Sequence, residues 1–434
     1  MALWFETALI DDEWASRVRL TFADGCIASV ETGVDPEPGD ERHAIGVPGL
    51  PNVHSHAFQR GMAGLAEARG PGSDDFWSWR ELMYRFVERI TPDDLEAIAA
   101  QAYAEMLETG FTRVGEFHYL HHLPDGTPTT EMAESIAAAA RATGIGLTLL
   151  PVFYAHGGFG GAPAGTAQRR FVNTPDSFAK LVEASRSLSD IVGIAPHSLR
   201  ATTPDELRAI LPLAAGGPIH IHIAEQVKEV QDCLAWSGKR PVEWLLGEMP
   251  VDARWTLVHA THMTDAERTA LARSGAVAGQ CPVTEANLGD GVFQAVGFLA
   301  EGGVTGIGTD SNVCIDAAEE LRLLEYGQRL TLRARNILAS NTRSTGARLF
   351  NAALTGGQQS LGGSCAGDWV SLSANDPAFA AHSGDAVLDS WIFAARSPID
   401  CVWRAGRKIV ADGRHIDAEA IATRYRHTLA RLLA

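Results

Sequence analysis

Residues 191–225 read IVGIAPHSLRATTPDELRAILPLAAGGPIHIHIAE and contain one complete unit of the expected fold. The two apolar runs in this stretch, 191–197 and 218–223, indicate strands that are buried on both faces. Between them, Thr203 and Pro204 predict the start of a helix, because threonine caps a helix and proline suits its first position. A buried strand, a helix and a second buried strand predict two parallel strands of one sheet.

The same alternation extends through most of the chain. Comparable helix starts stand at Thr91, Thr174 and Thr264. Eight strand–helix units within about 300 residues favour a (β/α)8 TIM barrel over an open sheet. The six further apolar runs are 48–56, 112–118, 147–153, 255–259, 276–281 and 304–309.

The two ends of the chain alternate polar and apolar residues instead. This pattern in 1–47 and again in 367–412 predicts antiparallel strands that close one small β-sandwich from both termini. Two long segments, 59–90 and 154–172, interrupt the barrel pattern, and loops of this length are often lids. The expected division is a composite β-sandwich of 1–47 plus 360–415, a barrel of 48–359 and a C-terminal helix of 416–434.

The composition restricts the classes of partner. Of the 434 residues, 46% are hydrophobic and 21% are charged, which fits a globular protein with a large core. The net charge of −17 disfavours nucleic acid and anionic membranes, so an anionic substrate would need arginines at the site itself. The sequence has no apolar run of about 18 residues that could span a membrane, and its acidic start does not resemble a signal peptide. Six scattered cysteines without a C-x-x-C pair indicate reduced thiols, so we expect a cytoplasmic protein and, in addition, a homodimer.

Candidate functional residues stand where predicted strands end, which is where barrel enzymes place their chemistry. His54 and His56 end the first strand, and positions i and i+2 of a strand point the same way. Two adjacent imidazoles suit zinc or iron. For this H-x-H pair alone, two polar loop residues are the alternative.

Other strand ends add to this pair. His222 ends the fifth predicted strand, and Glu225 follows three residues later. His259 ends the sixth strand and Asp310 ends the eighth. Four histidines and two carboxylates at one rim predict a mononuclear metal site with a general acid/base beside it. For Glu225 alone, an acid favoured by the start of a helix is the alternative.

These motifs resemble those of the amidohydrolase superfamily, with H-x-H on strand one, H-x-x-E on strand five, His on strand six and GTDS on strand eight. The stretch CPVTEANLGDG, 281–291, is similar to the strand-seven signature of the aminohydrolase branch. A β-sandwich from both termini is a common companion domain in that superfamily. Members with two metal ions carry a carboxylated lysine at the end of strand four. His197 stands there in this chain, so the resemblance implies one divalent ion.

The resemblance also implies roles for the strand-end residues. The implied metal ligands are His54, His56, His222 and Asp310, and the implied catalytic groups are Glu225, His259 and Asp310. His222 is preferred over His220 because the family pattern counts three residues from the histidine to the glutamate. Asp310 would accept a proton from the attacking water, Glu225 would carry it to the leaving nitrogen, and His259 would stabilise the tetrahedral centre. Zinc is the expected ion, and iron also fits imidazole ligands.

Within this branch the resemblance is strongest to the formimidoylglutamate deiminase family. It rests on NVHSHAFQRGMAG, DDFWSWRELMY, EFHYLHH and APHSLRA. The implied reaction converts N-formimidoyl-L-glutamate and water to N-formyl-L-glutamate and ammonia, in histidine degradation. Deaminases of the same branch that act on a ring, such as guanine or cytosine, are the alternative. A barrel scaffold that has lost catalysis is a further one.

A substrate with two carboxylates needs cationic anchors in an acidic protein. Arg80 in the first insertion and Arg200 after the fourth strand are the candidates, because arginine holds a carboxylate through two parallel hydrogen bonds. The other expected substrate-binding residues are Gln59, Tyr119 and His197. The alternatives are a surface salt bridge of Arg80 with Asp74 or Asp75, and a structural role for Arg200 at the next helix start.

Overall fold

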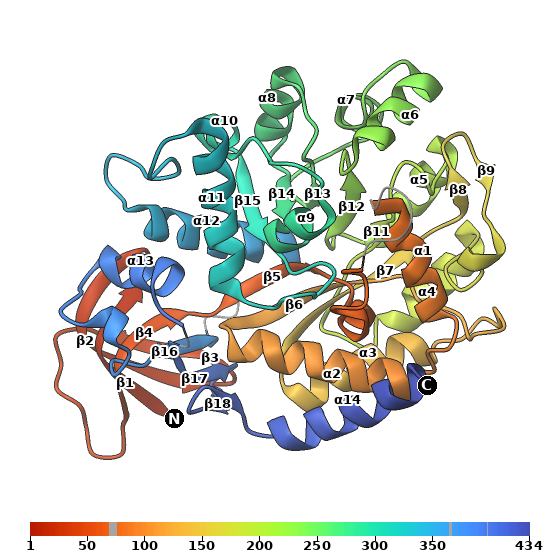
Figure 1. Ribbon diagram of the computed structural model, residues 1–434. Coiled ribbons are helices and arrows are strands. Elements are labelled where there is room, and N and C mark those ends of the chain that lie inside the picture. The colour runs from red at the N-terminus through yellow and green to blue at the C-terminus, as the bar shows by residue number, and fades with distance from the viewer. Residues whose placement is uncertain (69–75, 364–366, 397) are drawn as a thin grey trace.

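The computed structural model describes residues 1–68, 76–363, 367–396 and 398–434 (Figure 1). Eight parallel strand positions form a barrel, as the alternation of apolar runs and helices predicts. Isolated parallel bridges of Ile194 with Ile219 and of Ser55 with Asp310 join its two sheets into a ring. The barrel strands are β5 Leu50–Ser55, β6 Phe111–His118, β7 Gly146–Phe153, β10 Ile191–Val192 with β11 Ala195–Pro196, β12 Ile219–Ile223, β13 Trp255–His259, β14 Val277–Gln280 and β15 Val304–Ile307.

The fourth strand position differs from the continuous strand predicted for 191–197. It consists of β10 and β11, which both pair with β7 on either side of Gly193 and Ile194. A Cβ at Gly193 would lie 2.3 Å from the carbonyl oxygen of Pro218. Glycine therefore permits the close approach to the neighbouring chain that interrupts this strand.

Helices surround the barrel, and the threonines that predicted helix starts do cap them. Thr91, Thr174, Thr203 and Thr264 each accept a hydrogen bond from the backbone three residues later. The first insertion contains helix α1, and the second contains the short strands β8 His156–Gly158 and β9 Ala162–Pro163. The helices are α1 Phe76–Val87, α2 Pro92–Glu108, α3 Glu131–Thr143, α4 Pro175–Ser185, α5 Pro204–Ile210, α6 Val227–Ser237, α7 Pro241–Glu248, α8 Asp265–Ser274, α9 Pro282–Leu288, α10 Ala295–Ala300, α11 Ala317–Leu332, α12 Thr345–Leu361, α13 Asp385–Phe393 and α14 Ala418–Leu432.

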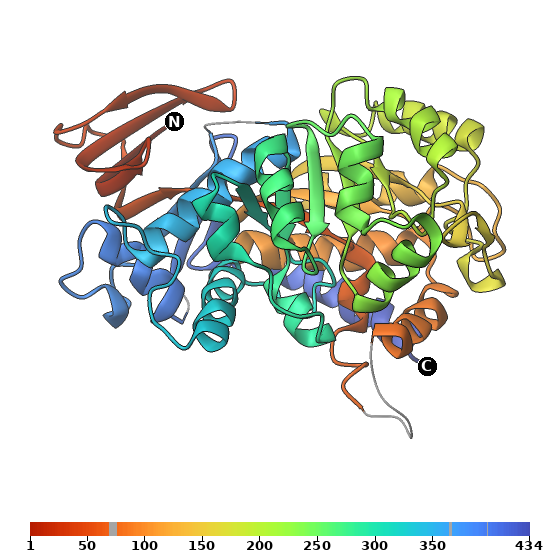
Figure 2. The ribbon, with the colours of Figure 1, turned by 90° about the horizontal axis from the view of Figure 1, so that it is seen from above.

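Strands from both termini form a separate eight-stranded sheet to one side of the barrel (Figures 1 and 2). Its order is β19-β18-β17-β16-β4-β1-β2-β3. Phe5, Leu20, Trp369 and Trp403 are buried in one cluster, so both ends of the chain share this core. The strands are β1 Ala2–Ile10, β2 Glu13–Ala23, β3 Cys26–Glu31, β4 Glu41–Pro48, β16 Trp369–Leu372, β17 Ile399–Arg404, β18 Arg407–Ala411 and β19 Arg414–His415.

One pairing in this sheet corrects the expectation of antiparallel strands throughout. β1 pairs with β2 in antiparallel register, but it pairs with β4 in parallel. The chain leaves β1 through the β2–β3 hairpin and returns to the other edge of β1 in the same direction. Alternating hydrophobicity cannot distinguish these two arrangements, because both bury every second side chain.

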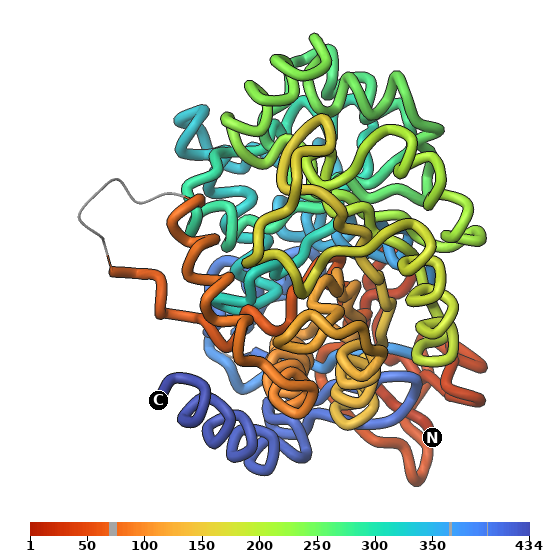
Figure 3. The backbone as a smooth tube through the Cα atoms, turned by 90° about the vertical axis from the view of Figure 1, so that its right-hand side faces the viewer, coloured from red at the N-terminus to blue at the C-terminus, as the bar shows by residue number. Residues whose placement is uncertain are grey.

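The C-terminal helix lies against α2 beside the barrel (Figures 1 and 3). The Tyr425 hydroxyl donates to the carbonyl of Arg60 at 3.1 Å, and Arg431 pairs with Asp94. Among the described residues, no helix has the length and apolar character needed to cross a bilayer. Cys365, one of the six cysteines, lies outside the described residues.

Candidate active site

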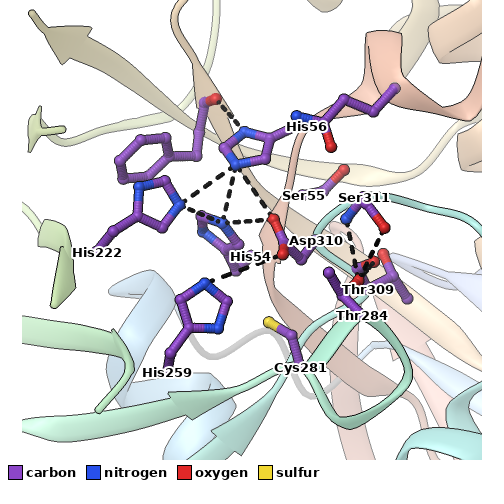
Figure 4. Close-up of polar contacts among 12 residues, drawn as sticks. His54, Ser55, His56, His222, His259, Cys281, Thr284, Thr309, Asp310 and Ser311 are labelled. Atoms are coloured by element: carbon purple, nitrogen blue, oxygen red, sulfur yellow. Dashed lines mark hydrogen bonds and ion pairs between the residues drawn. The ribbon is translucent and has the colours of Figure 1, made fainter. Parts of the chain in front are cut away.

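Four side chains from three barrel strands converge at one point of the rim (Figure 4). The Nε2 atoms of His54, His56 and His222 lie 3.1–3.3 Å from one another. Oδ1 of Asp310 lies 3.2 Å from Nε2 of both His54 and His56. Metal–nitrogen bonds of about 2.0–2.1 Å place tetrahedral ligands roughly 3.3 Å apart. These four residues, here called the donor cluster, therefore fit one divalent ion.

Backbone carbonyls orient two of the donor rings. His56 Nδ1 donates to the carbonyl of Phe117 at 3.0 Å, and His222 Nδ1 donates to the carbonyl of His197 at 3.1 Å. Each ring therefore keeps its proton on Nδ1 and leaves the Nε2 lone pair for an ion. His220, two residues before His222, instead donates from Nε2 to the carbonyl of Ser360 at 3.0 Å and is not part of the donor cluster.

Asp310 is held by a buried asparagine that the sequence analysis missed. The Asn312 side chain donates to Ser55 Oγ and to the carbonyls of His56 and Asp310, each at 3.1 Å. This amide joins the first and eighth strands, and so fixes Asp310 relative to the paired histidines. Burial alone would raise the pKa of Asp310, but its interactions with His54 and His56 outweigh burial and hold that pKa well below its usual range.

His259 and Glu225 lie beside the donor cluster. Nε2 of His259 is 3.9 Å from Asp310 Oδ2 and 3.8 Å from Glu225 Oε1. The other ring nitrogen, Nδ1, lies 3.2 Å from Glu285 Oε1. Burial opposes charge on the ring, but Glu225 and the hydrogen bond to Glu285 outweigh it and raise the pKa of His259 to about 10. Burial also raises the pKa of Glu225, against the effect of His259 and Arg200.

Two further glutamates, neither of them expected from the sequence, hold these residues in place. Glu229 accepts the backbone N–H of Glu225 at 3.0 Å and that of Ala224 at 3.3 Å, which secures the turn after β12. Glu285 accepts the backbone N–H of Cys281 at 2.9 Å as well as the His259 ring. The spacing of Glu229, four residues after Glu225, and the place of Glu285 within CPVTEANLGDG were the available signals.

A cavity of about 420 Å³ opens above the donor cluster. The Gln59 amide donates to the Tyr119 hydroxyl at 2.8 Å. From α1, the Arg80 guanidinium carbon lies 4.5 Å from the centre of the Trp77 ring and 5.5 Å from that of Tyr84. All five residues expected to bind substrate line this cavity, namely Gln59, Arg80, Tyr119, His197 and Arg200.

Two arginines form the cationic mouth of the cavity. Nε of Arg80 and Nε of Arg200 are buried and have no hydrogen-bond partner among the described residues. Burial lowers the pKa of Arg200, but Glu229 and Glu225 outweigh it and hold that pKa above its usual value, so the side chain stays charged. Asp74 and Asp75, the alternative partners of Arg80, lie outside the described residues. The mouth therefore presents donors to an anion that enters the cavity.

The parallel barrel with histidine and aspartate donors at its carboxyl rim defines a class of metal-binding TIM-barrel proteins. The model of the amidohydrolase family matches residues 45–353. The chain therefore belongs to the amidohydrolase family. A second model, the N-terminal domain of formimidoylglutamate deiminase HutF, matches residues 2–44.

Individual relatives extend this likeness over the whole chain. The chain is 49% identical to formimidoylglutamate deiminase of Pseudomonas aeruginosa, over 100% of this chain and 99% of that protein. It is similar to the crystal structure of an amidohydrolase from Brucella melitensis, with 55% identity, a TM-score of 0.97 and 100% coverage of both chains. A zinc-bound adenosine deaminase from Xanthomonas campestris shares the fold at 23% identity and a TM-score of 0.81, over 100% and 98% of the two chains.

Proposed function

We propose that this protein hydrolyses N-formimidoyl-L-glutamate to N-formyl-L-glutamate and ammonia, a step of histidine degradation. The observation that carries this proposal is a pair of arginines, Arg80 and Arg200, whose buried Nε atoms have no hydrogen-bond partner among the described residues. Both arginines line the same cavity as residues of the donor cluster. The full-length likeness to the Pseudomonas aeruginosa enzyme supports the same substrate.

We assign zinc as the resident ion, held by the donor cluster, because a set of three imidazoles and one carboxylate suits it; iron is the second choice. A divalent ion in such a site supplies Lewis acidity, which makes water a nucleophile near neutral pH. His54, His56 and His222 are neutral ligands, so one carboxylate leaves the filled site with net positive charge.

The remaining groups move protons and stabilise charge. Asp310 Oδ2, the oxygen turned toward His259, accepts a proton from the water that attacks the formimidoyl carbon. Glu225 passes protons to the imine nitrogen, which leaves as ammonia when the carbon–nitrogen bond breaks. His259 donates from Nε2 to the oxygen at the tetrahedral carbon.

The cavity mouth selects the glutamate part of the substrate. We assign the two carboxylates to Arg200 and Arg80, since each guanidinium can donate two parallel hydrogen bonds. Gln59, Tyr119 and His197 line the same cavity and complete the contacts. These contacts hold the formimidoyl carbon over the donor cluster, so part of the binding energy orients the reacting carbon.

Ammonia release from a substrate panel tests the proposal. The panel contains formimidoylglutamate, guanine, cytosine and S-adenosylhomocysteine, with N-formimidoyl-L-alanine as a matched comparator that lacks the side-chain carboxylate. We expect the highest kcat/KM for formimidoylglutamate and a strong loss for the alanine compound. Preference for a ring would favour the ring-deaminase alternative, for which the aromatic side chains of the cavity would serve as stacking surfaces.

Two further assignments accompany this function. We propose that the protein acts in the cytoplasm. We propose as well that it is a homodimer, which light scattering of the purified protein would test. We also propose that the composite β domain, 1–47 plus 360–415, meets the barrel, 48–359, near Gly49. This glycine lies between β4 and β5, and Ala418–Leu432 forms the terminal helix.

A further inference from the structure

A second group of potential ligands lies next to the donor cluster and shares Asp310 with it. His259, Cys281 and Asp310 each offer one ligand atom, all within 4.8 Å of one another, and all three side chains are buried. Figure 4 shows His259 and the Cys281 sulfur on the side of Asp310 that faces away from His56. These three residues, here called the second donor group, combine an imidazole, a thiol and a carboxylate.

Glu285 fixes two members of this group through one oxygen. Oε1 of Glu285 lies 3.2 Å from His259 Nδ1 and accepts the backbone N–H of Cys281 at 2.9 Å. Because Nδ1 is occupied, Nε2 is the His259 atom that is turned toward Asp310, at 3.9 Å from Oδ2. Bonds of about 2.0–2.3 Å to nitrogen, oxygen and sulfur allow ligands up to roughly 4 Å apart. Small side-chain rotations therefore suffice to enclose an ion.

The surroundings favour an added cation. Two further acidic side chains border the group: Oε1 of Glu225 lies 3.8 Å, and Oε1 of Glu285 3.2 Å, from nitrogen atoms of the His259 ring. The thiol itself makes no hydrogen bond among the described residues, so no partner has to be displaced. Glu225 lies 3.8 Å from His259 Nε2 and can supply a fourth ligand.

We propose that His259, Cys281 and Asp310 form a second, inhibitory site for a soft divalent cation. The cation forms bonds to Sγ of Cys281 and Nε2 of His259, and the protons that it replaces on these atoms leave to solvent. Thiolate ligation selects zinc or cadmium over magnesium or calcium. Once bound, the second ion engages His259 and Glu225, which removes both from the reaction proposed above, so activity falls reversibly. The site itself goes beyond that reaction and does not depend on its substrate.

Cadmium is the probe for this site, added to protein that holds one zinc ion per chain. Equilibrium dialysis with elemental analysis counts the ions, and ultraviolet absorption detects charge transfer from thiolate to cadmium. We expect one additional ion per chain with zinc retained, and a parallel rise of absorption and inhibition. Magnesium at the same concentrations should do neither.

The matched variants are Cys281→Ser and Cys314→Ser. Cys281→Ser should bind the second ion about tenfold or more weakly, without the charge-transfer band, because a hydroxyl is a poor ligand for a soft ion. Cys314→Ser removes an exposed thiol outside the second donor group and should respond as the parent does. Inhibition is compared with the uninhibited rate of the same variant.

Three results would overturn the proposal. Cadmium could simply replace zinc, Cys281→Ser could bind the second ion with the affinity of the parent, or the parent could be inhibited without the absorption band. The last of these results is measured on the parent protein, so it tests the proposal even if Cys281→Ser does not fold. Ion counts and absorption need no substrate, so they remain valid if the proposed deiminase reaction fails.

Discussion

The donor cluster and the cavity mouth serve one cavity but are built from different parts of the chain. His54, His56, His222 and Asp310 stand on barrel strands or directly after them and are only 0–6% exposed. Backbone carbonyls and the Asn312 amide hold them in place. The mouth arginines come from an inserted helix and from the loop after β11, and their Nε donors have no hydrogen-bond partner among the described residues.

This difference predicts that the reaction and the choice of substrate depend on different parts of the chain. The barrel core fixes the geometry of the donor cluster, so damage there should affect every substrate and the metal content. The mouth arginines are the proposed contacts of the substrate carboxylates, so damage at the mouth should change selectivity and leave the metal in place. Changes at His56, Glu225 and Arg200 test this separation.

Loss of one donor should have the largest effect. His56→Ala, or removal of metal by a chelator, should abolish activity toward every substrate of the panel, because three ligands hold the ion weakly and no longer enclose it. Metal content per chain and kcat/KM are the measurements. His427→Ala, which removes an exposed histidine of α14, is the control. Full activity of a verified metal-free preparation would contradict a metal-dependent reaction.

The next largest effect should follow removal of Glu225, the proposed proton carrier. Glu225→Gln keeps the size of the side chain, so the ion should stay bound while kcat falls by about 10² or more. Elemental analysis and kcat are measured on the same preparation. Loss of the metal would make Glu225 a ligand, and near-normal turnover would make it a structural residue at the start of the loop.

Most of the fold could be predicted because its signals are local. A strand that is covered on both faces must be apolar throughout, and a threonine cap acts on the residues that follow it directly. The barrel and the four helix starts therefore follow from short stretches of sequence. The parallel pairing of β1 with β4 and the interruption at Gly193 depend on distant chain segments, and no local pattern records them.

The donor cluster shows the same limit. Residues at strand ends were predictable, because a parallel barrel brings those ends together. The groups that orient them were not. Asn312, Glu229 and Glu285 act through side-chain contacts whose partners only the folded structure brings near. Asn312 in GTDSN, Glu285 in CPVTEANLGDG and Glu229 four residues after Glu225 are visible in the sequence, but no local pattern gives them a role.

A smaller effect is expected at the cavity mouth. Arg200→Lys keeps the charge but loses the paired hydrogen bonds to a carboxylate, at a cost of about 2 kcal/mol, which is roughly 30-fold in kcat/KM for formimidoylglutamate. Metal content should not change. Arg208→Lys, on the surface beside Asp205, is the matched control.

The selectivity of this variant sharpens the comparison. N-formimidoyl-L-alanine retains the α-carboxylate and the reacting group. If Arg200 holds the side-chain carboxylate, Arg200→Lys should lower kcat/KM much less for the alanine compound than for formimidoylglutamate. Equal losses for both compounds would place Arg200 on the α-carboxylate, and parental kinetics with both would exclude Arg200 from substrate binding.

The smallest effect concerns His220, which shares strand β12 with His222 of the donor cluster but instead donates to the carbonyl of Ser360. Burial lowers the pKa of His220 from 6.5 to about 4, against the hydrogen bond to Ser360. Between these two values the unfolded chain binds the proton and the folded chain does not, so stability falls as the pH falls. The loss of unfolding free energy between pH 7 and pH 5.5 should be about 1 kcal/mol.

His220→Gln keeps a donor for the Ser360 carbonyl and cannot titrate, so urea unfolding should show a smaller loss for this variant over the same interval. Other groups, including the metal ligands, contribute equally to both proteins and cancel in the difference. An unchanged pH dependence would show that His220 is protonated at its ordinary pKa and is not held neutral by burial.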